Sequence, residues 1–173
     1  MMKKSVFFFL FFLIALCGNG CAFSSYRQVR DFDLDVEPVS SDGRIRVEVV
    51  RNASSSGQRL QSRSYFELNK DPYHVWAIEP GALVCNALNR ALGKDGVTPT
   101  IRLICELDCF EADLVQQEFR ISGICQLRNS PEKTRFVITS PLRTHSPENI
   151  VLAASDSVKK LAARLAEFGK NIK

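Results

Sequence analysis

The chain has 173 residues, with 23 lysines and arginines against 19 aspartates and glutamates. This length favours one domain, and a hydrophobic content of 45% is enough for a packed core, which excludes global disorder. The net charge of +4 is too small to indicate a dedicated nucleic-acid binder, so no nucleic-acid partner is expected.

Residues 1–20 have the pattern of an export signal peptide. Lys3 and Lys4 form a basic start, and residues 6–17 are an apolar run of 12 residues without a charge. A membrane-spanning helix needs about 20 apolar residues, so this run is too short to cross a bilayer. Its length is typical of a signal peptide. A buried N-terminal helix is the alternative, but the run offers no polar face.

The end of this signal resembles a bacterial lipobox, because the small residues 18–20 stand directly before Cys21. In that pattern a signal peptidase cuts before a lipid-modified cysteine, so Cys21 would become the lipidated first residue. Cys17 is the rival, but the bulky Leu16 precedes it. Ordinary secretion with an unmodified thiol is the alternative. Two or more acyl chains hold a protein stably on a bilayer, and Ala22, in place of Asp, favours the outer membrane.

The region after Cys21 is expected to be a lipidated tether with a weak first strand over 21–41, followed by a single α/β domain over 42–173. In the weak strand Phe32, Leu34 and Val36 alternate with polar residues. Further strands are expected at 44–50, 63–68, 100–110, 117–128 and 135–139, and helices at 80–92 and 146–168.

Periodicity gives the fold class. In 101–109 every second residue is apolar, and Arg102, Glu106 and Asp108 lie on the opposite face, which predicts antiparallel strands with one solvated face. Pro80 and Pro147 each suit the first turn of a helix, and both helices carry an apolar stripe. The sequence therefore predicts an α+β fold, a mostly antiparallel sheet of about five strands with two amphipathic helices packed on one face.

Four further cysteines are expected on apolar faces of these elements, and they are Cys85, Cys105, Cys109 and Cys125. None has CxxC spacing and the two histidines are far apart, so no metal site is expected. Buried thiols, or one bridge such as Cys105 to Cys125, both remain open, because four cysteines allow three full pairings.

The sequence contains no nucleophile elbow, phosphate-binding loop or zinc-protease motif, so neither an enzyme nor a cofactor is expected. His74 follows Asp71 in an expected polar-aromatic loop and is interpreted as a packing or surface residue. Trp76, the only tryptophan, stands just before Glu79. It is interpreted as a packing anchor for the next helix, with a partner-binding aromatic as the alternative.

The stretch from Tyr65 to Leu83 resembles a recurrent segment of the ABC-type transport auxiliary lipoproteins, a family similar to paraquat-inducible protein C. In that family a strand with aromatic residues leads to a helix opening of Trp-Ala, an acidic residue, Pro and Leu. Tyr65, Trp76 and Glu79 match this pattern as possible interface or packing anchors, with Ile78 inserted. The alanine- and serine-containing helix over 151–168 extends the resemblance.

This resemblance implies a lipoprotein at the outer membrane, lipid-anchored and facing the periplasm. Its partners would be an Mce-domain protein and the ABC transporter complex of a lipid transport system, with phospholipid as possible cargo and a ring-like homo-oligomer by analogy. The alternative is a structural envelope lipoprotein that assists outer-membrane or cell-wall assembly. A hydrolase is a third hypothesis and would need a pocket that unites His74 with an acid and a nucleophile.

Overall fold

The computed structural model describes residues 28–54 and 57–172. The expected signal peptide and Cys21 lie outside these residues, so the lipid anchor stays a prediction. None of the helices in the described part is both long enough and apolar enough to cross a membrane.

Within the described residues the chain forms seven strands and two helices. The strands are β1 (Arg30–Phe32), β2 (Ile45–Asn52), β3 (Arg59–Ser64), β4 (Glu67–Trp76), β5 (Ile101–Asp113), β6 (Glu118–Leu127) and β7 (Lys133–Pro141). The helices are α2 (Pro80–Leu92) and α3 (Pro147–Lys170).

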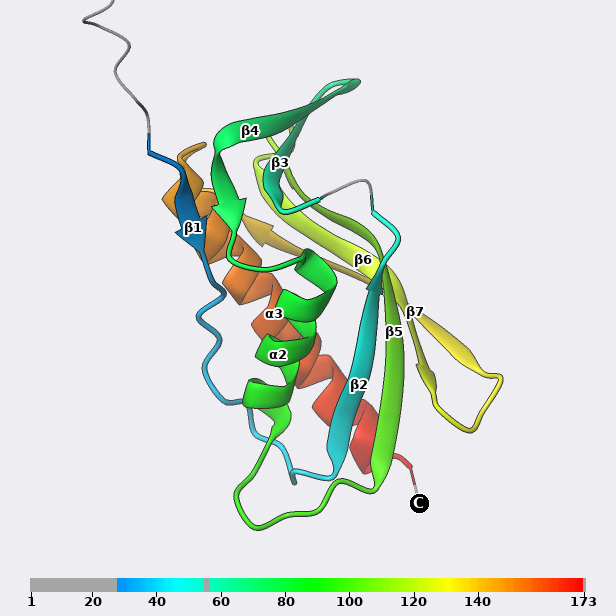
Figure 1. Ribbon diagram of the computed structural model, residues 1–173. Coiled ribbons are helices and arrows are strands. Elements are labelled where there is room, and N and C mark those ends of the chain that lie inside the picture. Colours follow the sequence, from blue (N-terminus) through cyan, green and yellow to red (C-terminus); the bar gives the residue numbers. More distant parts are fainter. Residues whose placement is uncertain (1–27, 55–56, 173) are drawn as a thin grey trace, which may run out of the picture.

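The strands form one mixed sheet, in the order β1-β4-β3-β5-β6-β7, with β2 also paired to β5 (Figure 1). The long strand β5 has β2 along its first half and β3 beside its end, at Ala112 and Asp113. Three pairs are parallel (β1–β4, β2–β5 and β3–β5) and three are antiparallel. The expected α+β class is confirmed, whereas the expected sheet of about five mostly antiparallel strands is only roughly right.

The largest correction concerns the hairpin of β3 and β4. The sequence predicts one strand over 63–68, but Tyr65 and Phe66 form the turn between two strands, since Ser64 pairs with Glu67. The β4 strand was missed because it is polar and contains Pro72, both of which are unusual in a central strand. His74, expected in a loop, lies in β4.

The first strand is also shorter than expected. Only Arg30–Phe32 pairs with β4, in parallel. Leu34 and Val36 are nevertheless buried, because the chain after β1 continues beside the two helices. The Leu34 carbonyl accepts a hydrogen bond from Arg90 of α2 (2.8 Å), and the Asp35 N–H donates one to Ser155 of α3 (3.1 Å).

A bulge in β5 changes which residues face the core. The pairing with β6 shifts between Leu107 and Cys109. A bulge reverses the alternation of faces along a strand, so Phe110 is buried while Cys109 is only half-buried. The expectation that Cys109 lies on the core face with Leu107 is therefore wrong.

Both helices lie on the same face of the sheet, as predicted (Figure 1). Helix α2 packs on β2 and against α3, while α3 covers β6 and β7. The side chain of Asn89 in α2 accepts a hydrogen bond from the Val47 N–H (2.9 Å) and donates one to its carbonyl (2.8 Å). These bonds satisfy backbone groups of Val47 on the edge of β2.

Candidate functional site

Trp76, the first of the sequence-predicted anchors, is a core residue. Its side chain is 2% exposed, and its ring lies 5.2 Å from that of Phe110, which in turn packs edge-on against Phe119 at 5.0 Å. This row of three aromatic rings connects the end of β4 with β5 and β6. The indole N–H has no hydrogen-bond partner in the described part of the chain. Trp76 therefore contributes packing, and no surface remains on it for a partner.

Glu79 acts as the N-cap of α2. Its carboxylate accepts a hydrogen bond from the Ala82 N–H at 3.1 Å. A carboxylate at this position satisfies a free backbone donor and interacts favourably with the positive end of the helix dipole. The acidic residue of the family-like motif is thus explained by helix capping alone.

Tyr65 lies at the opposite end of β4 from Trp76, so the structure does not bring these two predicted anchors together. Tyr65 is 76% exposed and Phe66 is 98% exposed at the tip of the β3–β4 hairpin. The sequence pattern missed the exposure of Phe66 because two adjacent aromatic residues suggest a strand interior. The residues after Phe66 do not alternate between apolar and polar, and this is the signal in the sequence that indicates a turn.

Cys105 and Cys125 face each other across β5 and β6 and form a disulfide, with their Cα atoms 4.2 Å apart. The bridge is buried beneath the helices and joins the two central strands. It is one of the options that the sequence left open.

The other described cysteines, Cys85 and Cys109, are free. Burial raises the pKa of both thiols. For Cys109 burial and the nearby negative charge of Glu111 raise the pKa to about 11. Since the thiolate is the nucleophilic form of cysteine, neither residue is activated at neutral pH.

His74 forms a local pair with Asp71, with 2.8 Å between Nδ1 and Oδ2. Burial by itself would raise the Asp71 pKa, but hydrogen bonds from the Tyr73 N–H and from His74 hold that pKa below its ordinary value. The carboxylate is therefore already engaged within β4, by the Tyr73 and His74 N–H groups and by the His74 ring. Within residues 28–54 and 57–172 no three His, Cys, Asp or Glu side chains come together as a possible metal site.

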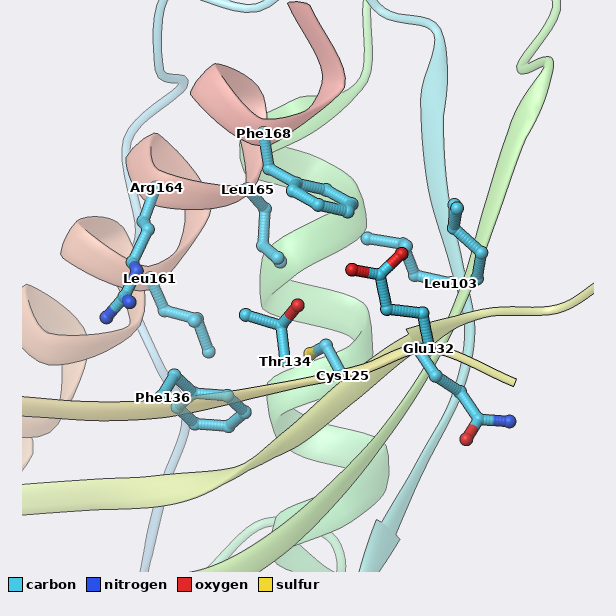
Figure 2. A pocket seen from close by; sticks show the side chains of 11 residues that line it. Leu103, Cys125, Glu132, Thr134, Phe136, Leu161, Arg164, Leu165 and Phe168 are labelled. Atoms are coloured by element: carbon cyan, nitrogen blue, oxygen red, sulfur yellow. The ribbon is translucent and has the colours of Figure 1, made fainter. Parts of the chain in front are cut away.

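A small apolar cavity lies between the C-terminal half of α3 and strands β6 and β7 (Figure 2). Its lining includes Phe136, Leu161, Leu165 and Phe168, and its volume is about 70 Å³. A cavity that holds one benzene molecule measures about 150 Å³. The space is therefore too small for an acyl chain.

Two lysines of α3, Lys159 and Lys160, are paired with neighbouring groups. Lys159 forms an ion pair with Glu37, and Lys160 pairs with Asp156 at 2.9 Å. Lys160 also donates to the Thr139 carbonyl at 3.0 Å. These lysines therefore fasten α3 to the N-terminal segment and to β7.

Comparisons with known proteins show the fold alone. Neither a family model nor a curated protein matches the chain. A crystal structure of an uncharacterized protein shares 13% identity, with a TM-score of 0.65, and covers 82% of this chain and 98% of its own. The crystal structure of protein XCC0632 from Xanthomonas campestris, described with the family model DUF330, shares 15% identity at a TM-score of 0.61. It covers 80% of this chain and 92% of its own.

Proposed function

We propose that this protein is an outer-membrane-anchored auxiliary lipoprotein of an ABC/Mce-type lipid transport system, where it docks partner proteins beside the membrane. The observation that carries the proposal is the lipobox ending at Cys21. The helix opening from Trp76 to Glu79, which resembles that of the auxiliary lipoproteins, supports the assignment to this kind of system.

The start of the domain suits an anchored protein. Cys21 stands seven residues before Gln28, the first described residue, and seven residues span at most about 25 Å. The chain then enters the sheet directly as β1. Arg30 of that strand forms an ion pair with Glu148 of α3 at 2.6 Å. The anchor is therefore connected to both the sheet and a helix through a short segment, which keeps the domain close to the bilayer.

The size of the cavity under α3 favours a role in docking partner proteins rather than a role in carrying a lipid inside the domain. The apolar cavity under α3 has a volume of about 70 Å³, so a phospholipid tail does not fit in that cavity. In this proposal any phospholipid cargo passes through the partner proteins, while this subunit holds their ends beside the membrane.

One edge of the sheet offers a place for a partner protein. In the described part of the chain β7 pairs only with β6. The short Cα distance between Cys105 and Cys125 is typical of a non-hydrogen-bonded pair, so Cys125 directs its backbone groups toward β7. Because the direction of the backbone N–H and C=O groups alternates along a strand, those of Arg135 and Val137 point away from β6, toward the open edge. An extended segment of a partner can add to this edge.

The experiment combines lipid labelling with partner capture. Cys21→Ala should abolish palmitate labelling, while Cys17→Ala should leave it unchanged. The lipidated protein, extracted in mild detergent, should then co-purify an Mce-domain protein. Unchanged labelling of Cys21→Ala would overturn the anchor. Repeated recovery of cell-wall or outer-membrane assembly factors alone would replace the transport role with the structural envelope role.

A further inference from the structure

The β3–β4 hairpin projects from the sheet as an arm (Figure 1), and its tip carries two exposed aromatic residues. Tyr65 and Phe66 form its two-residue turn, and their exposed fractions are 76% and 98%. Tyr65 has a φ of 52°, in the left-handed region that bulky residues seldom adopt. The turn therefore combines two unfavourable features, a strained backbone conformation and apolar side chains in contact with water. Sites with such features are commonly functional.

The end of β3, directly before the turn, is held firmly to β5. Nε of Arg63 donates to Glu111 of β5 at 2.5 Å and Nη2 donates to the same carboxylate at 3.2 Å. Glu111 is only 8% exposed, so the carboxylate of this ion pair is shielded from solvent. The Leu114 N–H also donates to the Arg63 carbonyl at 2.8 Å. The residue two positions before Tyr65 is thus fixed to β5, so the turn needs little further ordering to bind.

The turn between β5 and β6 lies at the same end of the molecule, because Leu114 contacts the last residues of β3. Val115 in this turn is 42% exposed. This end therefore carries exposed apolar side chains on two neighbouring turns, Tyr65 and Phe66 on one and Val115 on the other.

The described chain also begins at this end (Figure 1). Arg30, the first residue of β1, pairs with His74 in β4, which lies eight residues along the chain from Phe66. Cys21 precedes Arg30 by nine residues, and the exposed Val29 lies on the way to it. A membrane that holds a lipid on Cys21 is therefore within reach of the aromatic tip.

We propose that Tyr65 and Phe66 insert into the interfacial layer of the membrane that carries the Cys21 lipid, as a second contact between the domain and the bilayer. This inference rests on the lipid anchor of the proposed function. Tryptophan and tyrosine side chains favour the level of the lipid headgroups, and phenylalanine is among the apolar residues that interfacial helices bury at the boundary of headgroups and acyl chains. A protein partner is less suited to the tip, because two side chains on a narrow turn provide far less than the roughly 800 Å² per partner of a stable protein interface.

The test places a tryptophan at the tip of the full, lipidated protein. Phe66→Trp is reconstituted into phosphatidylethanolamine and phosphatidylglycerol vesicles, with and without bromine on the acyl chains. Trp76 is buried in the core, so the wild-type protein gives the background emission. The emission maximum of the added tryptophan should shift to shorter wavelength, and the brominated lipid should quench at least half of that emission. Val137→Trp, exposed on β7, is the matched control and should lose none.

The outcomes separate this inference from the proposed function. Palmitate labelling of the same samples reports lipidation. A lipidated Phe66→Trp protein whose emission is not quenched would overturn the membrane contact while the anchor stands. Protection of that tryptophan only after addition of a partner protein would reassign the tip to protein docking. An unlipidated Cys21 would overturn the proposed function and, with it, the membrane contact.

Discussion

Trp76 and Phe66 are both large aromatic residues of the same hairpin arm, and their surroundings are opposite. The ring of Trp76 fills the core beside Phe110, whereas Phe66 contacts solvent. The family-like motif spans both residues. Only the three-dimensional structure separates the one that stabilises the fold from the one that is available for binding.

Trp76→Ala should lower the free energy of unfolding by about 3–5 kcal/mol, because it removes a fully buried ring and leaves a cavity beside Phe110. Urea unfolding followed by circular dichroism measures the change. Trp76→Phe is the control and should cost much less, since the indole N–H has no described hydrogen-bond partner to lose. Wild-type stability of Trp76→Ala would contradict the buried position.

Cys109 makes the fold sensitive to alkaline pH. Its ordinary pKa of 9.0 is raised to about 11 in the folded protein, first by burial and then by the charge of Glu111. Between these values the unfolded chain has lost the thiol proton and the folded chain has kept it. The contribution is therefore complete below pH 9 and declines as the pH rises toward 11.

The expected loss from this thiol is about 1 kcal/mol of unfolding free energy between pH 8 and pH 10. Denaturant unfolding at both pH values, for the wild type and for Cys109→Ala, isolates it. The variant should lose less stability than the wild type over this range. An equal loss in both proteins would show that Cys109 ionises normally in the fold.

At the scale of elements, β5 organises the sheet because it has β2, β3 and β6 as neighbours. Its bulge between Leu107 and Cys109 lies where its partner on one side changes from β2 to β3. Opposite this bulge stands Gly123 of β6. A Cβ atom there would lie 2.0 Å from the carbonyl oxygen of Glu106 and 2.9 Å from the Phe136 ring.

Gly123→Ala should therefore destabilise the protein by at least about 1–3 kcal/mol, because backbone of β5 must move to make room. Gly57→Ala is the control, since a Cβ at that loop position meets no atom within 4 Å. Thermal unfolding of both variants measures the difference in melting temperature. A melting temperature of Gly123→Ala equal to that of Gly57→Ala would contradict the close approach of the two strands.

Elements with a clear apolar period were predictable from the sequence. Both helices and the strands β5 and β6 follow their apolar periods, and the Cys105–Cys125 pairing is among the possibilities that the sequence leaves open. The three parallel pairs were missed because parallel strands are joined by distant connections that leave no local pattern. The hairpin tip was missed because Tyr65 and Phe66 were assigned to a strand interior, where their backbone would be extended.

At the scale of the whole molecule, the two ends differ in character. One end has the aromatic hairpin tip, the β5–β6 turn and the start of β1 (Figure 1). The other end has the connection from β6 to β7, which includes the exposed polar residues Arg128, Asn129 and Glu132. The ten residues of β6 separate the two ends by about 33 Å. An anchor and a hairpin contact at the first end would direct the second end away from the bilayer.

This orientation predicts the behaviour of a tryptophan placed at Asn129. In the lipidated protein on brominated vesicles, Asn129→Trp should keep its emission and be quenched by aqueous iodide, whereas Phe66→Trp should behave oppositely. Changing Tyr65 and Phe66 to serine leaves the lipid as the remaining contact, so the domain should tilt on its short tether. Asn129→Trp in that background should then become partly quenched by the brominated lipid. Equal quenching at positions 66 and 129 in the otherwise native protein would mean that the domain lies flat, because only then do both ends of β6 touch the membrane.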